Sequence, residues 1–81
     1  MHPDALEPLL RWYKIAKAAR WDNLTDVRSD FGHADSVGKF TVFNIAGNKY
    51  RLVVDVAFRF HTVYVLHILT HHEYSKGRWK V

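Results

Sequence analysis

The C-terminal third of the sequence gathers side chains that can move protons and bind a phosphate. Residues 70–76 are Thr-His-His-Glu-Tyr-Ser-Lys, Arg78 follows them, and Arg51 lies upstream in a segment rich in β-branched residues. RNA supplies its own nucleophile, the 2′-OH, so a protein that cleaves it needs a proton acceptor, a proton donor and positive charge on the phosphorane. Histidine, tyrosine, lysine and arginine meet these needs. A structural tail can have the same composition, so the clustering alone leaves both interpretations open.

The histidines raise the alternative of a metal site. His67, His71 and His72 form an H-x-x-x-H-H pattern. His67 falls in a predicted strand, however, and four strand residues span roughly 13 Å, too far for one zinc ion to bridge. The chain has no cysteine to complete such a site, and it has no Gly-x-Ser-x-Gly motif or glycine-rich phosphate loop. We therefore predict neither a metal nor a cofactor.

Length, composition and charge indicate one globular domain, residues 1–81, with an anionic partner. The chain is 48% hydrophobic and 25% charged, as is usual for folded domains. Residues 1–38 hold five Lys or Arg against six Asp or Glu, whereas residues 39–81 hold seven against two. This asymmetry predicts that the second half binds a polyanion. Neither a signal peptide nor an apolar run of ~18 residues is present, so we expect a cytoplasmic protein without membrane contact.

The hydrophobic periodicity predicts two helices followed by a sheet. Residues 3–20 and 23–31 have helical spacing, the second with Asn23 or Asp22 as its cap and Gly32 as its stop. Residues 32–38 are turn-forming and indicate a linker. Strands are predicted over residues 39–45, 50–59 and 62–70, with a hairpin at 46–49, where Gly47 and Asn48 tolerate positive φ, and a turn at 60–61. No element is expected in residues 71–81. The expected fold is α+β, with two N-terminal helices on one face of a three-stranded antiparallel sheet.

Four parts of the sequence resemble the HigB family of toxins. Residues 42–53, Val-Phe-Asn-Ile-Ala-Gly-Asn-Lys-Tyr-Arg-Leu-Val, are similar to the family's F-N-I-x-G-N-K-Y-R-L-V motif. Residues 63–65 and 70–74 resemble its V-Y-I and T-H-x-E-Y motifs, and Trp21 with residues 31–35 resembles its W…F-x-x-A-D segment. The resemblance covers nearly the whole chain. It implies a RelE-like fold, metal-independent mRNA cleavage during translation on the ribosome, and neutralisation by a helix-turn-helix antitoxin of the HigA type.

Seven residues are the candidates for this chemistry. We expect Arg51, which alternation places opposite the apolar face of its strand, to contact the phosphate, with a structural pair with Asp55 as the alternative. His71 and Tyr74 are the candidates for proton transfer, provided that the last strand ends near Thr70. The candidates for RNA binding are Lys49, His72, Lys76 and Arg78.

A second interpretation is a non-catalytic domain that binds RNA, the ribosome or an antitoxin. Leu66 stands where the family often has a basic residue, and Ser75 where it commonly has aspartate. The strand with which the family opens is also missing from this sequence. A missing first strand predicts an exposed sheet edge, which can pair with a second copy of the chain or with an antitoxin strand.

Overall fold

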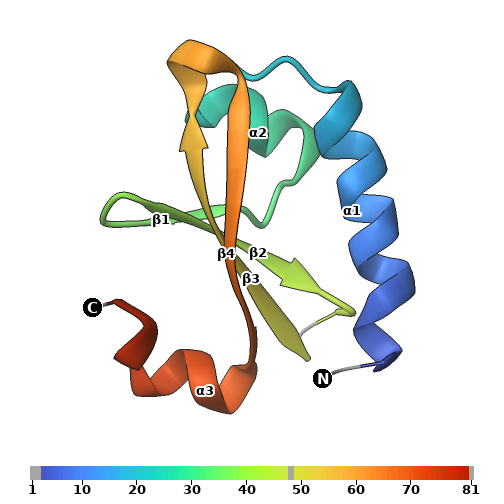
Figure 1. Cartoon of the computed structure of the whole chain (residues 1–81), viewed down its shortest axis with the longest axis vertical. Helices are drawn as coiled ribbons and strands as arrows, with labels where there is room; N and C mark the ends of the chain where they lie inside the picture. Colours follow the sequence, from blue (N-terminus) through green and yellow to red (C-terminus); the bar gives the residue numbers. More distant parts are fainter. Residues whose placement is uncertain (1–2, 48, 81) are drawn as a thin grey trace.

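In the computed structural model, which describes residues 3–47 and 49–80, the chain has an α+β fold built on a four-stranded antiparallel sheet (Figure 1). Within these residues the helices are α1 (Leu6–Ala18), α2 (Leu24–Asp30) and α3 (His71–Lys76). The strands are β1 (Asp35–Val37), β2 (Phe40–Ile45), β3 (Tyr50–Ala57) and β4 (Thr62–Thr70), and they lie in the sheet in chain order. Short 3-10 turns cover Pro3–Ala5, Phe58–Phe60 and Arg78–Lys80. None of the described helices is long and apolar enough to cross a membrane.

The helix predicted over residues 3–20 is confirmed but is shorter at both ends. Pro8 lies in the first turn of α1, where its missing N–H leaves no hydrogen bond unmade. The buried face of α1 is centred on Trp12, and this leaves Leu6, Leu10 and Tyr13 more than half exposed. After Ala18 the chain becomes extended at Ala19. That change of direction carries Trp21 into the core, where it is 5% exposed.

The second predicted helix is also confirmed, and it ends one residue before its predicted end. The side chain of Asn23 caps α2 by accepting a hydrogen bond from the backbone N–H of Asp26 at 3.0 Å. The chain leaves the helix at Phe31, before the predicted stop at Gly32. This places the Phe31 ring edge-on against the Phe43 ring, with centroids 5.1 Å apart. Packing against the sheet, rather than glycine, therefore sets the end of α2.

The prediction of a linker over residues 32–38 was wrong, because this segment contains a fourth strand. Asp35–Val37 forms β1, which pairs with β2 through the register Asp35↔Val42 and Val37↔Phe40. Gly38 adopts a φ of 60° in the turn between them, a conformation that glycine adopts without steric cost. A strand of three residues, two of them polar, is too short for alternation to be detected.

The hairpin between β2 and β3 lies where it was predicted, after Ile45 and before Tyr50, and follows the prediction partly in turn geometry. Gly47 has a φ of 67°, as predicted, and Ala46 also has a positive φ of 53°. The expected role of Asn48 lies outside the described residues. The strand predicted over 50–59 ends at Ala57, since Phe58–Phe60 form a 3-10 turn. The predicted apolar face of this strand packs against α1 and α2. The buried residues of this shared core include Trp12, Trp21, Val27, Phe43, Tyr50, Leu52 and Val54.

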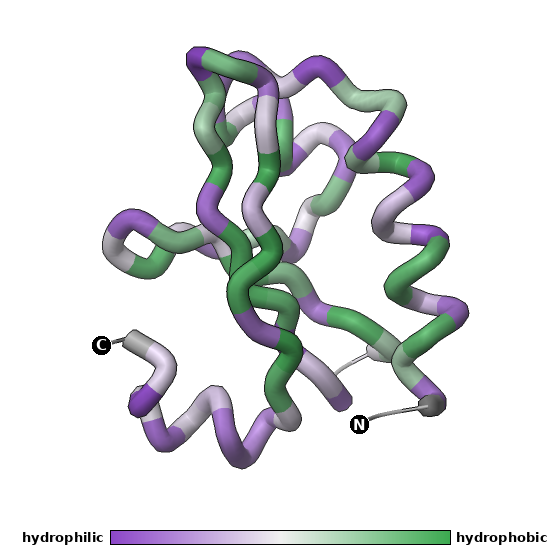
Figure 2. The backbone as a smooth tube through the Cα atoms, in the orientation of Figure 1, coloured by the Kyte–Doolittle hydropathy of each residue, from purple (hydrophilic) through white to green (hydrophobic). Residues whose placement is uncertain are grey.

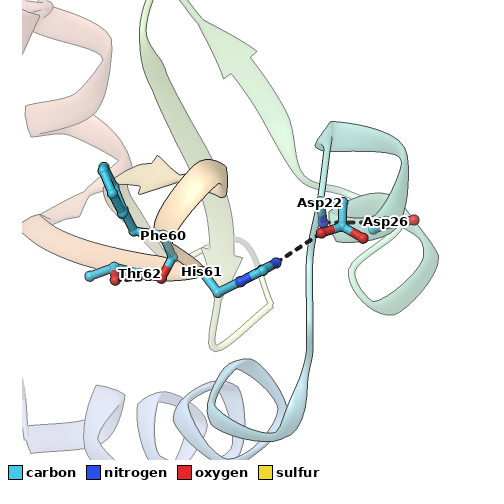
Figure 3. Close-up of polar contacts among 5 residues, drawn as sticks. All are labelled: Asp22, Asp26, Phe60, His61 and Thr62. Atoms are coloured by element: carbon cyan, nitrogen blue, oxygen red, sulfur yellow. Dashed lines mark hydrogen bonds and ion pairs between the residues drawn. The ribbon is translucent and has the colours of Figure 1, made fainter.

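The turn between β3 and β4 is tied to the segment that joins α1 to α2. His61 has a φ of 51°, and its Nε2 hydrogen-bonds Asp22 Oδ1 at 2.8 Å (Figure 3). The backbone N–H of Asp22 in turn donates to Asp26 Oδ2 at 3.0 Å. The predicted third strand, 62–70, is confirmed as β4. Its register against β3 shifts between Val53, which faces His67, and Val54, which faces Val65.

The expectation of no element after residue 70 was wrong. Thr70 Oγ1 accepts from the backbone N–H of Glu73 at 3.1 Å, and Glu73 Oε1 accepts from the backbone N–H of Thr70 at 2.9 Å. This capping box starts α3 directly at the end of β4, and Gly77, with a φ of 72°, ends the helix. Along the tube in Figure 2, α3 is mostly hydrophilic, whereas the central strands are mostly hydrophobic.

The C-terminal segment gives the sheet a second covered face. Trp79 is 6% exposed and packs with Val42 and Val53, which point away from α1 and α2. We call this face of the sheet the α3 face, and the one packed against α1 and α2 the helix face. The expected arrangement, with three strands and helices on one face only, therefore needs two corrections. The sheet has a fourth strand, and a third helix and Trp79 lie on the other side.

Candidate active site on the α3 face

Arg51 lies on the α3 face, as strand alternation predicted. In the sheet it stands between Asn44 of β2 and Leu69 of β4. Its side chain is half-buried, Nη1 donates to the carbonyl of Tyr50 at 3.2 Å, and the guanidinium carbon lies 5.8 Å from the centre of the Tyr74 ring. The distance to Tyr74 is within the range of a cation–π contact.

Tyr74 also packs against Trp79. The two rings stack with centroids 5.1 Å apart and an interplanar angle of 16°. The Trp79 Nε1–H also donates to the Tyr74 carbonyl at 2.9 Å. Tyr74 therefore contacts both a ring that is buried against the sheet and the Arg51 guanidinium. Two of the three predicted catalytic residues, from distant parts of the sequence, are therefore in contact.

His71, the third predicted catalytic residue, is in the first turn of α3. Its backbone N–H donates to the Lys49 carbonyl at 3.1 Å, which anchors the start of α3 beside the β2–β3 hairpin. The side chains of His71 and His72 are both exposed. Neither imidazole has a hydrogen bond to Arg51 or Tyr74 in the described part of the chain. The role predicted for His71 required the last strand to end near Thr70, and β4 does end at Thr70.

A hollow lined by charged side chains lies between β4 and the C-terminal segment. Lys76 and Arg78, both predicted to bind RNA, line it together with Glu73 and His67. Trp79 and Leu69 supply its apolar part. The hollow and the Arg51–Tyr74 contact share Trp79 as a wall. Cations that line such a hollow are suited to binding a phosphate backbone.

Lys49, the remaining predicted RNA contact, forms an ion pair with Asp4. Its Nζ lies 3.5 Å from Asp4 Oδ2, at the start of the chain's first turn. The Tyr50 hydroxyl also donates to the Asp4 carboxylate. This hydrogen bond is the main cause that lowers the pKa of Asp4 and raises the pKa of Tyr50. The structure therefore does not bring Lys49 into the hollow beside Lys76 and Arg78.

Trp79 was not predicted to belong to the site, and His67 was predicted to have no role in it. The signal for Trp79 was a large aromatic residue between two cations in a polar tail. His67, which was predicted to lie in a strand, is a half-buried residue of β4 and also lines the hollow. In residues 3–47 and 49–80, no three His, Asp or Glu side chains are grouped closely enough to hold a metal ion.

Comparison with known families defines the class of protein to which this fold and site belong. The model of the HigB_toxin family, described as the RelE-like toxic component of a toxin–antitoxin system, matches residues 5–77. The chain therefore belongs to the HigB toxin family, and the resemblance seen in the sequence motifs is confirmed. Membership makes it the toxin of a toxin–antitoxin pair, with an antitoxin as its partner. No curated protein matches the chain. Trp79 lies beyond the matched residues.

Proposed function

We propose that this toxin is a metal-independent endoribonuclease that cleaves mRNA on the ribosome, in the cytoplasm, with residues 1–81 acting as a single toxin domain. The observation that carries the proposal is the contact of Arg51 with Tyr74, held in place by Trp79 beside the cationic hollow. It places positive charge and a phenol hydroxyl on one face of the sheet. Membership of a RelE-like toxin family supports the same activity.

The proposed reaction uses the RNA's own hydroxyl. The 2′-oxygen attacks the adjacent phosphorus, and the bond from phosphorus to the 5′-oxygen breaks. A 2′,3′-cyclic phosphate and a 5′-hydroxyl result. One proton leaves the 2′-OH and one is delivered to the departing oxygen, so the reaction needs an acceptor and a donor. Arg51 stabilises the charge on the phosphorane, and His71 and Tyr74 are the proposed proton carriers.

Basic side chains around the centre are proposed to hold the RNA backbone. Lys76 and Arg78 contact phosphates from the hollow, and His72, exposed in the first turn of α3, contacts them from outside it. Lys49 can join them only by giving up its ion pair with Asp4, which is exposed and therefore weak. The proposed antitoxin is a helix-turn-helix protein of the HigA type.

Two observations favour the alternative, a binding domain without cleavage. Ser75 stands where the family commonly has aspartate, and its hydroxyl donates to the His71 carbonyl at 2.9 Å. The Ser75 hydroxyl is therefore hydrogen-bonded within its own helix, and serine carries no negative charge that could orient a histidine. Leu66, where the family is often basic, is an exposed apolar residue of β4. In this alternative the chain binds RNA, the ribosome or its antitoxin and leaves mRNA intact.

Cleavage during translation separates the two functions. A reporter mRNA is translated with the purified chain, and new 5′ ends are mapped by primer extension. The proposal predicts new ends that carry a 5′-hydroxyl, matched by upstream 2′,3′-cyclic or 3′-phosphate ends. The chain with Arg51→Ala is the control and should give few such ends. Intact mRNA on ribosomes that have bound the wild-type chain would establish the non-catalytic alternative.

A further inference from the structure

The outer edge of β4 is open. On its inner side β4 pairs with β3 from Thr62 to Thr70, interrupted by the register shift at Leu66, whereas no strand pairs with its outer side in residues 3–47 and 49–80. Tyr64, Val65 and Leu66, in the middle of this strand, are 55%, 58% and 44% exposed. A long edge strand without charged side chains is a template for pairing with another extended segment.

A groove runs beside this open edge on the helix face. Side chains from α1 and β4 line it, mainly Trp12, Tyr13, Ala16, Lys17, Val63 and Val65. Most of this lining is apolar, as the floor beneath an added strand needs to be. Trp12 is 6% exposed, and among the described residues its buried Nε1–H has no hydrogen-bond partner. A buried donor without a partner is costly, and an acceptor brought in from outside would remove that cost.

The charge around the groove indicates what can enter it. Lys17 lines it, with its Nζ 5.9 Å from the centre of the Tyr13 ring, and none of the described residues in the lining is acidic. Arg11 and Lys14, on the same helix, line other hollows, so Lys17 supplies the charge here. A second copy of the chain would bring another Lys17 and no carboxylate from the described lining. A segment with a carboxylate would complement Lys17.

We propose that the open edge of β4 and this groove bind an extended, acidic segment of a protein partner, which pairs with β4 as an additional strand. The side chains on the inward face of the segment are apolar where they meet Val63, Val65 and Ala16, and a carboxylate on that same face lies opposite Lys17. The proposal does not rest on RNA cleavage, because the groove lies on the helix face and the Arg51–Tyr74 contact on the α3 face. Either can fail without the other.

A synthetic peptide tests the proposal. The probe is a short fluorescein-labelled peptide with valine at every second position, a glutamate at each end of that same strand face and threonine between them. Its binding to the full chain is followed by fluorescence anisotropy. The same peptide with N-methylated backbone amides keeps the side chains but cannot pair as a strand. Hydrogen exchange then locates the bound peptide, with β1, the other edge of the sheet, as the internal comparison.

A charge reversal on α1 provides a matched pair of variants. Lys17→Glu should weaken binding by about fivefold or more, the effect of one partly exposed ion pair. Lys14→Glu makes the same change on the same helix outside the groove and should have less than about half that effect. Both side chains are exposed, so both variants should fold.

The expected result is saturable binding of the unmodified peptide, with slower exchange of β4 amides and unchanged exchange in β1. The proposal is overturned if the peptide does not bind, if the N-methylated peptide binds equally well, or if the protected amides lie in β1. It is also overturned if light scattering shows that the free chain is a dimer whose β4 amides are already protected. In that case a second copy occupies the edge.

Discussion

The guanidinium of Arg51 faces the ring of Tyr74 at 5.8 Å, although the two residues come from β3 and α3. If this pair is the reactive centre, Arg51→Ala should lower the rate of mRNA cleavage by ~10²-fold, the usual cost of losing one donor to a developing charge.

Tyr74→Phe keeps the ring and its stacking on Trp79, and should lower the rate by ~10²–10⁴-fold through the lost hydroxyl. Single-turnover cleavage measures both. A Tyr74→Phe variant with wild-type rate and melting temperature would exclude the tyrosine from proton transfer.

The two adjacent histidines of α3 should differ in effect. His71 is anchored through its backbone to the β2–β3 hairpin, and we expect His71→Ala to lower the cleavage rate by ~10²–10⁴-fold. His72→Ala should weaken RNA binding and change the single-turnover rate at saturating RNA little. Each variant is compared at saturating and subsaturating RNA. A larger loss of rate in His72→Ala would transfer the proton-carrying role to that residue.

RNA affinity should depend steeply on salt, because bound phosphates release counterions. The measured quantity is the slope of a plot of the logarithm of the binding constant against the logarithm of the salt concentration. Lys76→Ala should make this slope shallower by about 0.7, the value for one phosphate contact with a single strand. Lys14→Ala, on α1 and outside the hollow, is the control and should leave the slope unchanged. Equal slopes for wild type and Lys76→Ala would show that the hollow does not hold the RNA backbone.

The contact of Tyr50 with Asp4 predicts how stability depends on pH. It lowers the pKa of Asp4, so its stabilising effect is complete above the carboxyl's unfolded pKa and is lost as the pH falls through the lower, folded value. It raises the pKa of Tyr50, so that contribution is complete below the phenol's unfolded pKa and is lost as the pH rises through the higher, folded value. Tyr50→Phe should therefore flatten the pH profile of the free energy of unfolding at both ends. Tyr13→Phe, on the exposed side of α1, should not.

Trp79 should be essential for the α3 face. Trp79→Ala removes a buried ring that packs on Val42 and Val53, and should lower the free energy of unfolding by about 3 kcal/mol. Trp79→Phe keeps part of the stacking on Tyr74 and should cost less. Urea unfolding measures both changes. A loss below about 1 kcal/mol for Trp79→Ala would mean that the C-terminal segment contributes little to holding Tyr74.

The elements that periodicity could predict are those with a long buried face. The helices α1 and α2 and the strands β2, β3 and β4 each repeat apolar residues often enough to define a side. The strand β1 has only three residues and gains its structure from pairing with β2. Alternation cannot detect such a strand, because the partner and not the segment itself determines its conformation.

The candidate site was predictable where strand alternation or a motif fixed the position of a side chain. Alternation placed Arg51 on the face opposite the helices, and Tyr74 belongs to a motif next to the end of β4. The position of the C-terminal segment over the sheet could not be predicted, because it depends on the packing of Trp79 against Val42 and Val53. The capping pattern of Thr70 and Glu73 was present in the sequence and would have indicated α3. The ion pair of Lys49 with Asp4 joins residues too far apart for any local pattern.

Thr70 is both the last residue of β4 and the cap of α3, so strand and helix meet without a loop. This junction has no loop residues that could accommodate an insertion or a deletion. One inserted residue would turn the helix by about 100° relative to the strand, since a turn contains about 3.6 residues. Tyr74 would then point away from Arg51. Relatives that keep this site should vary in length in the hairpins and never between the last strand and its helix.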